Sequence, residues 1–335
     1  MKLIKILPSL DGKIVIEIYR IGGFCLKEKI FWVSILVIIL SYIGNYLYFQ
    51  SKQLDAPLFL EHYYELTLND EDETMLTFYY VTNKSDSSTI NHVQIDGIEA
   101  YASSNMDFMW ESQEPQFEQE YTHHYLKALY VTFPADFEGE GPLSFSEMEV
   151  HLSNGKNLMA DIGEVILHKS TENPDVLQTQ ISSSSNQHRE EKSMVALKPI
   201  TIEEIEIPFK EGLSDDIFIK VDLEQDKLRE LEKLKTGANP PKWFDEDREK
   251  DWNDLPGVTV RDDLLPFTLE QNEWVRFLMQ FNPTRHSYFQ FSIKLNGKTE
   301  SGEEFVRELP IIDHPDLDQK AINEIIEEKE AGESE

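Results

Sequence analysis

The chain has 335 residues, and its 31 Lys and Arg against 63 Asp and Glu give a formal net charge of −32. A surface this acidic repels phosphate, and no basic strip with interleaved aromatic residues is present, so nucleic-acid binding is excluded. The only cysteine is Cys25. Thiol catalysis and cysteine-based zinc sites are therefore excluded from everything that follows it.

Residues 30–49 form a 20-residue stretch without a single charge. A helix of this length rises about 30 Å, which matches the hydrocarbon thickness of a bilayer. Aromatic side chains stand near its two ends, as in the interfacial belts of membrane proteins: Trp32, Tyr42, Tyr46 and Tyr48. The sequence therefore predicts a transmembrane helix over 30–49, with the lipid bilayer as its partner.

The charges on the two sides of this stretch predict its orientation. Residues 1–29 hold six basic and three acidic side chains, whereas residues 51–335 hold the remaining 25 basic and 60 acidic ones. Positively charged flanks stay cytoplasmic, so we expect 1–29 inside the cell and everything after Gln50 outside. The apolar run is longer than that of a cleaved signal peptide and no small-residue cleavage site follows it, which predicts an uncleaved signal anchor.

The segment 1–29 is too short for a domain and is expected to be a short cytoplasmic tail. An alternative is that translation begins at Leu26 instead. Gly22-Gly23 can be encoded by the bases of a bacterial ribosome-binding site, and Leu26 by the initiator TTG. The protein would then contain no cysteine. A disulfide-free outer region suits a bacterial envelope protein.

The outer region predicts a mainly β fold with two tandem immunoglobulin-like antiparallel β-sandwich domains, over 55–169 and 194–315. Between them, residues 170–193 are rich in Ser, Asn, Gln and charge, which indicates a linker. Residues 316–335 are expected to start as a helix and to end as a disordered acidic tail.

Runs rich in aromatic and β-branched residues predict strands in the first domain at 63–68, 75–83, 90–96 and 125–133. In the second domain, alternation of apolar and polar residues predicts half-buried strands. Their apolar positions are Ile205, Ile207 and Phe209; Ile217, Ile219, Val221 and Leu223; Val275, Phe277, Met279 and Phe281; and Phe289, Phe291, Ile293 and Leu295.

Each domain is predicted to end in a strand, an Asn-Gly turn and a return strand. The turns are placed at Asn154-Gly155, with type I′ geometry, and at Asn296-Gly297, because Asn-Gly tolerates positive φ. This similarity suggests a weak internal repeat. Between strands of the second domain, "LEQDKLRELEKLKTG" has helical spacing.

The sequence carries no motif of a known catalytic or phosphate-binding site. The nine histidines are scattered, and a role on the surface or in the core is favoured for each over metal binding. No catalytic residue and no cofactor are expected.

One acidic run offers hard oxygen ligands for calcium at alternating positions: Asp245, Asp247, Glu249 and Asp251. It lacks the glycine at the sixth position of an EF-hand loop, where Lys250 stands. We therefore favour a solvated loop over a calcium site.

Three aromatic residues interleave with these charges: Trp243, Phe244 and Trp252. Tryptophan is frequent among the residues that dominate binding energy at interfaces, so the three are candidates for binding a partner. The alternative is that they fix a long loop onto its own domain.

The expected function is that of a non-enzymatic, single-pass envelope protein, whose two outer domains bind another protein. It could serve as an accessory or sensor subunit of a membrane complex. The alternative is a cell-surface module that binds carbohydrate or a cation.

Overall fold

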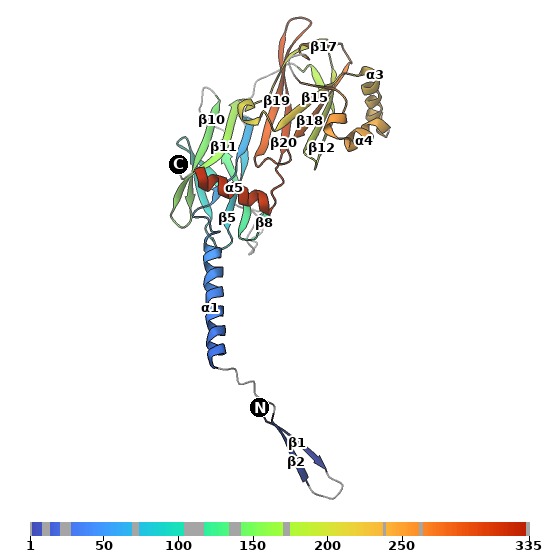
Figure 1. Cartoon of the computed structure of the whole chain (residues 1–335). Helices are drawn as coiled ribbons and strands as arrows, with labels where there is room; N and C mark the ends of the chain where they lie inside the picture. Colours follow the sequence, from blue (N-terminus) through green and yellow to red (C-terminus); the bar gives the residue numbers. More distant parts are fainter. Residues whose placement is uncertain are drawn as a thin grey trace. The chain divides into compact units, whose positions relative to one another are not determined.

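A computed structural model of the chain describes residues 2–8, 14–20, 28–68, 74–103, 117–133, 142–169, 175–236, 239–260 and 264–332. The chain divides into two compact units, Met1–Gln53 and Leu54–Glu335. Figure 1 shows the helices and strands of each unit.

The first unit holds a hairpin and a helix. Strands β1 (Lys2–Pro8) and β2 (Ile14–Arg20) pair antiparallel, and α1 spans Glu28–Gln50. The predicted helix over 30–49 is confirmed, and none of its residues from Ile30 onward is buried by the rest of the chain. The alternative start at Leu26 lies outside the described residues.

The second unit is mainly β. Its first half contains β3 (Leu58–Phe59), β4 (His62–Leu68), β5 (Thr74–Asn83), β6 (Ile90–Ile95), β7 (Ile98–Ser103), β8 (Gln119–Glu120), β9 (His124–Phe133), β10 (Leu143–Leu152) and β11 (Asn157–Lys169). All four strands predicted in this half are present.

The second half contains β12 (Leu177–Ser185), β13 (Arg189–Ala196), β14 (Ile200–Glu206), β15 (Ile217–Asp222), β16 (Val258–Thr259), β17 (Phe267–Leu269), β18 (Trp274–Phe281), β19 (Tyr288–Thr299) and β20 (Glu304–Asp313). Its helices are α2 (Lys210–Leu213), α3 (Gln225–Leu228), α4 (Lys242–Glu249), α5 (Gln319–Gly332) and the 3-10 helices η1 (Arg229–Thr236) and η2 (Trp252–Asp254).

These strands form two sheets. The larger has 13 strands in the order β17-β14-β19-β4-β11-β10-β6-β7-β9-β5-β3, with β20 beside β19 and β8 beside β9. The smaller has five strands in the order β12-β13-β18-β15-β16. The coarse prediction, a mainly β fold that follows an apolar helix in the sequence, is confirmed.

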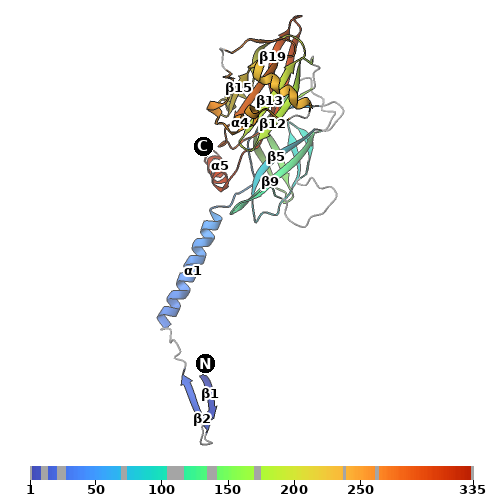
Figure 2. The same ribbon diagram turned by 90° about the vertical axis from the view of Figure 1, so that its right-hand side faces the viewer.

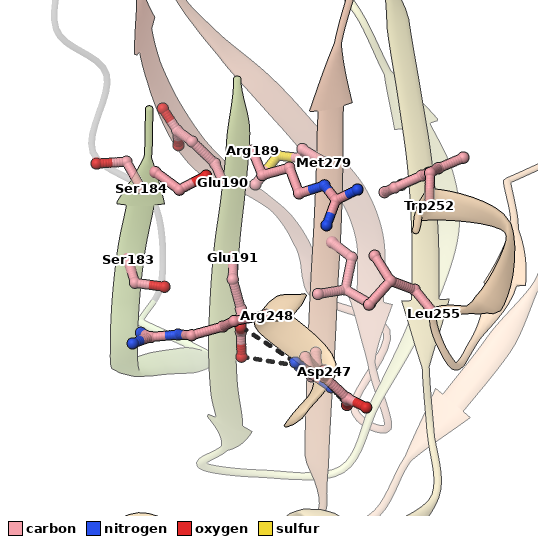
Figure 3. Close-up of a pocket in the computed structure, with 13 residues that line it drawn as sticks. Ser183, Ser184, Arg189, Glu190, Glu191, Asp247, Arg248, Trp252, Leu255 and Met279 are labelled. Carbon is pink, nitrogen blue, oxygen red and sulfur yellow. Dashed lines mark hydrogen bonds and ion pairs between the residues drawn. The ribbon is translucent and has the colours of Figure 1, made fainter. Parts of the chain in front are cut away.

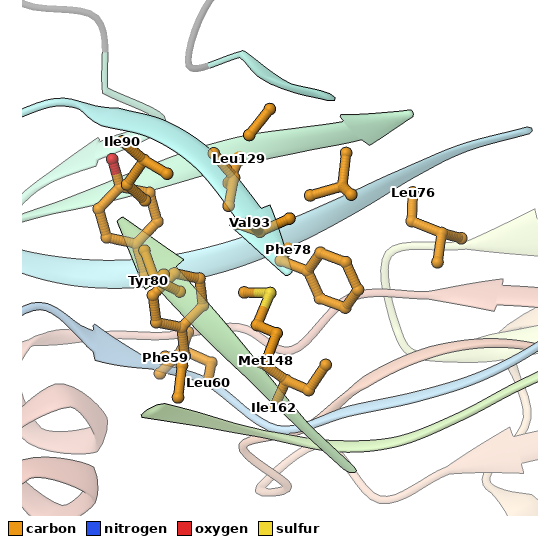
Figure 4. Packing of buried hydrophobic residues seen from close by; sticks show 14 of the residues in the cluster. Phe59, Leu60, Leu76, Phe78, Tyr80, Ile90, Val93, Leu129, Met148 and Ile162 are labelled. Atoms are coloured by element: carbon orange, nitrogen blue, oxygen red, sulfur yellow. The ribbon is translucent and has the colours of Figure 1, made fainter. Parts of the chain in front are cut away.

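The first buried cluster lies inside the curled half of the large sheet, where β5 returns to face β4. The hydroxyl of Tyr64 on β4 donates a hydrogen bond of 2.8 Å to the carbonyl of Thr77 on β5. Apolar side chains fill the space between these strands (Figure 4), among them Phe59, Leu60, Leu76, Phe78, Tyr80, Val93, Met148 and Ile162.

The second buried cluster lies between the five-stranded sheet and the β14, β19 and β20 end of the large sheet. All members of the two predicted sets on β18 and β19 are buried, including Phe277 and Phe291. The set on β15 is buried from Ile217 to Val221, and Leu223 packs half-buried against the same cluster. Alternation therefore identified these three strands correctly. Of the set Ile205, Ile207 and Phe209, only Ile205 lies on a strand, β14, and all three are half-buried.

Strand β4 joins the two halves, because it pairs in parallel with β11 along one edge and with β19 along the other. The prediction of purely antiparallel sheets is wrong at this point. Gly163 of β11 has φ +89, and a Cβ there would lie 2.4 Å from the carbonyl oxygen of His62. Only glycine permits so close an approach of the two backbones.

His62 is fully buried at this junction. Its Nε2 accepts a hydrogen bond of 2.9 Å from the backbone N–H of Tyr79 on β5, so its Nδ1 carries the proton donated to Ile162 O at 3.1 Å. Its ring lies 5.3 Å from that of Tyr288 on β19, with the planes nearly parallel. One neutral side chain of β4 thus contacts three other strands, β5, β11 and β19.

The predicted linker over 170–193 is wrong wherever the structure describes it. β12 and β13 form an antiparallel hairpin, and β13 also pairs with β18 in the middle of the small sheet. Val176, Leu177 and Met194 are buried in the second cluster. The polar composition misled because β12 is an edge strand whose Ser and Gln side chains mostly face solvent. Residues 170–174 lie outside the described residues.

The predicted acidic tail is ordered as far as the structure describes it. Helix α5 packs Ile322 and Ile325 into the first cluster, and Leu317 precedes it there. The hydroxyl of Tyr121 donates a 2.9 Å hydrogen bond to Leu317 O. Figure 2 shows α5 beside β5 and β9. The end of the chain therefore completes the core of the first half, which corrects the expectation of a disordered end up to residue 332.

The two predicted turns differ from expectation. The first hairpin forms, but only Gly155 has positive φ, so its turn is a type I turn followed by a glycine bulge rather than type I′. Asn296-Gly297 lies inside β19, and the turn to β20 is made around Gly302, which has the same hydrogen-bond pattern. The proposed internal repeat at Asn-Gly is therefore wrong.

The first buried cluster takes most of its members from before residue 170, but Tyr288, Leu317, Ile322 and Ile325 from the later part of the chain also belong to it. The buried members of the second cluster all lie after residue 170, and a shared sheet and α5 connect the two halves within one compact unit. Two independent sandwich domains remain a prediction.

Neighbouring residues on β20 give a matched test of the second cluster. Ile311 is 0% exposed and Ile312 is 60% exposed. Ile311→Ala is expected to lower the free energy of unfolding by about 2–5 kcal/mol, because it leaves a cavity. Ile312→Ala should change it by less than about 0.5 kcal/mol. Denaturant unfolding of the full chain in detergent micelles, followed by tryptophan fluorescence, measures both; equal effects would contradict the burial.

Burial lowers the pKa of His62 to about 3, with backbone hydrogen bonds opposing the shift only in part. Because the unfolded chain binds a proton near pH 6.5 and the folded chain does not, stability is complete above pH 6.5 and falls as the pH drops toward 3. The loss is at most about 5 kcal/mol. His62→Asn should start from a lower stability and show a shallower pH dependence than the parent. Parallel pH profiles of the two proteins would contradict this assignment.

Candidate functional site

The outer face of the five-stranded sheet carries the densest group of buried charges in the described residues. β18 alternates, so Val275, Phe277 and Met279 face the second cluster while Trp274, Arg276 and Leu278 face outward. The segment from α3 to α4 covers this outer face (Figure 1). Leu228, Leu231 and Phe244 of this cover pack on Val195 and Trp274, which holds it in place.

Arg276 is the centre of the group and is 1% exposed. Its Nε and Nη2 donate to the two carboxylate oxygens of Glu191 at 2.8 and 3.1 Å, a bidentate pair. Its Nη1 donates to Asp247 at 2.7 Å. Burial by itself would lower the pKa of Arg276, but the hydrogen bonds and charges of Glu191 and Asp247 raise it. Arg276 is therefore fixed as a cation.

Asp247 is the acid that ties α4 to the sheet. Besides Arg276, it accepts hydrogen bonds from Lys227 at 3.2 Å and Lys250 at 2.8 Å. Burial opposes ionisation, but the bonds from Lys250 and Arg276 and the charges of Arg276 and Lys227 prevail, so the pKa of Asp247 lies below its usual value. Three cations thus surround one buried carboxylate.

The calcium candidates do not converge. Asp245, Asp247 and Glu249 lie on α4, where residues two apart point to different sides, and Asp251 follows the helix. Asp247 faces inward to its three cations, while Asp245, Glu249 and Asp251 are exposed. In the part of the chain that the structure describes, no group of three or more His, Cys, Asp or Glu is arranged to hold a metal ion.

The three aromatic candidates pack against their own unit. Phe244 is buried, and the Arg276 guanidinium lies 5.7 Å from its ring centre. Trp243 is half-buried under Lys227, whose Nζ lies 4.4 Å from its ring centre. Lys220 lies 5.1 Å from the ring centre of Trp252. These contacts fit the alternative reading, in which the aromatics fix the loop onto the sheet.

A cavity of about 130 Å³ lies beside this group (Figure 3). Apolar side chains line part of it, Leu255 and Leu278 among them, and Trp252 stands at one wall. Arg189 and Arg248 line it as well, together with the hydroxyl side chains of the last three residues of β12. It combines apolar surface with arginine and serine donors, which is the composition of a ligand pocket.

A second, wider cleft of about 640 Å³ lies between the two halves and α5. Its charged groups largely pair with each other: Lys329 pairs with Asp161, and Arg285 pairs with Asp313 behind it. Burial and the surrounding carboxylates, first that of Glu61, raise the pKa of Tyr63 in its wall, so this phenol stays protonated. We regard it as a seam of the fold.

Two of the scattered histidines do meet. His92 of β6 and His151 of β10 are cross-strand partners, and their rings stack with centroids 4.0 Å apart. Glu149 lies 3.5 Å from His151. No third histidine joins them among the described residues, which agrees with the absence of a metal cluster there.

Sequence reasoning missed the residues at the centre of the site. Arg276 is the one charged residue of β18. β15 carries Lys220 and Asp222, whose carboxylate lies 4.0 Å from Arg276, and Glu191 fell in the supposed linker. When a strand is apolar on both faces and carries a single charge, that charge marks the face that points away from the core. The apolar residues on the same face then require another element to cover them. That signal was present at "WVRFLMQF".

Arg276→Met tests the buried group. The change leaves Glu191 and Asp247 buried without their main partner, so we expect a loss of about 3–5 kcal/mol in the free energy of unfolding. The triple change Arg276→Met, Glu191→Met and Asp247→Leu removes all three charges and should restore most of that loss. A triple variant as unstable as the single one would indicate lost packing instead of unpaired charge. The measurement is denaturant unfolding of the full chain in micelles.

Comparison with known proteins gives little. No protein-family model matches the chain, and no curated protein does. Among solved structures, the human desmocollin-1 ectodomain is similar with a TM-score of 0.18 and 10% identity, over 79% of this chain and 38% of that one. This chain thus spans well under half the length of that ectodomain, and a similarity of this size carries no argument about fold or function.

Proposed function

We propose that this protein is a single-pass membrane protein, which presents the unit Leu54–Glu335 outside the cytoplasm to bind another protein. It acts without catalysis, as an accessory or sensor subunit of a membrane complex. Each half of the unit, with its own buried cluster, serves as an immunoglobulin-like module.

Helix α1 is the observation that carries the proposal. Its apolar residues are spread around the whole circumference, and between Ile30 and Gln50 none is buried by the chain. A helix that is apolar all round needs an apolar environment on every side. Its length and composition are compatible with a membrane anchor and equally with a signal sequence. Lipid is the environment that we propose.

The flanking charges support the orientation. The six basic residues of 1–29 favour the cytoplasmic side, and the 60 acidic residues of 51–335 fit an exported domain. Retention of the helix is favoured because bulky aromatics stand at its end, at Tyr46, Tyr48 and Phe49, where a cleavage site would need small residues.

Protein binding is favoured over the alternative of a carbohydrate- or cation-binding module. The rings of Trp243 and Trp252 already carry lysine side chains, which leaves less free aromatic surface for stacking on sugar. The carboxylate of Asp247 is engaged by cations of its own unit. An open strand edge, described below, suits a polypeptide partner.

Topology is tested with epitope tags in intact cells. A tag after residue 335 should be accessible to antibody, and protease should remove it together with residues beyond about 55. A tag at the N-terminus should stay protected until the cells are lysed, which makes it the internal control. A protected C-terminal tag, or a mature chain that lacks α1, would overturn the proposed anchor.

A further inference from the structure

The two long edge strands of the second unit differ in their protection. Edge strands of soluble proteins usually carry charges or proline, which prevent another chain from pairing with them. β20, the edge beside β19, carries Glu304, Arg307, Glu308 and Pro310. β12, the edge of the five-stranded sheet, reads "LQTQISSSS" and contains neither a charged residue nor proline.

The second half of β12 is a regular strand with one side open. A register shift between Thr179 and Ile181 interrupts its pairing with β13, and 181–185 then pair without a break. Among the described residues, no strand pairs with its other edge. Ser182, Ser184 and Ser185 are exposed. A stretch of backbone N–H and C=O groups thus faces outward at 181–185.

This open stretch ends at the cavity beside Arg276. Ile181, Ser183 and Ser185 share the outer face of the sheet, opposite Ser193, Glu191 and Arg189 of β13. Ser183 and Ser185 line the cavity. Arg248 extends from α4 toward Ser183 (Figure 3), so a positive charge stands above the open edge.

The unneutralised charge of the cavity is positive. Its three carboxylates are paired: Glu191 with Arg276, Asp247 with three cations, and Glu190 with Lys192. Arg189 donates to neutral acceptors, Gln280 Oε1 and Lys250 O. Arg248 lies over the ring of Phe244 at 4.8 Å, with no ion pair to any described residue.

We propose that the edge of β12 at 181–185 binds an extended segment of a partner protein as an added strand, with one Asp or Glu side chain directed to Arg248. An added strand lies about 4.8 Å from β12, and its side chains on the outer face are neighbours of Ser183. Main-chain hydrogen bonds supply affinity and the arginine cavity supplies selectivity. The inference specifies the partner class of the proposed function, on which it rests.

The rest of the protein restricts the charge of that segment. With a net charge of −32, the chain repels a segment rich in carboxylates. One carboxylate among uncharged β-forming residues gains the short-range pair with arginine and avoids most of the repulsion. The expected ligand is therefore a β-prone segment with a single acidic residue.

The test uses the full chain in lipid nanodiscs and fluorescein-labelled nonapeptides of alternating Thr and Val, with Glu or Gln at the central position. Fluorescence anisotropy should show about tenfold tighter binding of the Glu peptide, a typical gain from a charge-assisted hydrogen bond. Arg248→Gln should abolish this preference. Arg229→Gln, at an exposed arginine that does not line the cavity, should retain it.

N-methylated peptides test the backbone pairing. A strand pairs with β12 through alternate residues only, so methylation of the odd or of the even amides should abolish binding in one case and spare it in the other. Equal binding of both methylated peptides, or a Glu preference that survives Arg248→Gln, would overturn the proposal. A third result would also overturn it: the purified chain forms a dimer, and Ser184→Lys dissociates that dimer. The edge of β12 would then be covered by a second copy of this chain. Peptide binding does not depend on the side of the membrane, so its failure is distinct from failure of the proposed topology.

Discussion

Strand β4 is paired along both edges with strands that run in its own direction, and the second unit depends on this arrangement. Parallel neighbours must come from distant parts of the chain, since a short turn cannot connect them. β11 and β19 meet β4 from the two halves, and His62 fixes the meeting point by bonding to β5 and β11 and stacking on Tyr288. The requirement for glycine at 163 follows from the same contact.

The outer face of β18 is held by buried ion pairs. The second cluster requires apolar residues on the inner face of β18 only. The outer face is also covered, by the segment from α3 to η2. Arg276 determines the position of that cover. It pairs with Glu191 of β13 and with Asp247 of α4, so α4 must lie where Asp247 reaches the guanidinium. A buried charge of this kind adds little net stability but strongly disfavours other placements, since any of them would leave a charge unpaired. The lysines around Asp247 extend the same restraint to α3 and to the end of α4.

Sequence reasoning succeeded where one local pattern decides the outcome. The apolar helix, the alternating strands at 275–281 and 289–295, and the buried phenylalanines follow from periodicity alone. It failed where the burial or the partner of a residue depends on residues far away in the chain. The serines of β12 read as a linker because their composition does not reveal that Val176 and Leu177 reach a core. Asp247 read as a calcium candidate because its partner Arg276 lies 29 positions later. Trp243 and Phe244 left two readings open, because their contacts with Arg276 of β18, which favour one of them, are not visible in the local sequence.

Helix α5 has a consequence for how the protein is made. Its side chains complete a cluster whose other members lie mostly between residues 59 and 167, so the beginning and the end of the second unit share one core. During synthesis, the first cluster stays incomplete until the segment that holds Ile325 has been made. The chain therefore cannot finish folding from its N-terminal end as it emerges, and a copy truncated before α5 would expose the apolar surface that cellular quality control recognises. In this way α5 makes completion of the first cluster depend on residues that are synthesised more than a hundred positions after most of its other members.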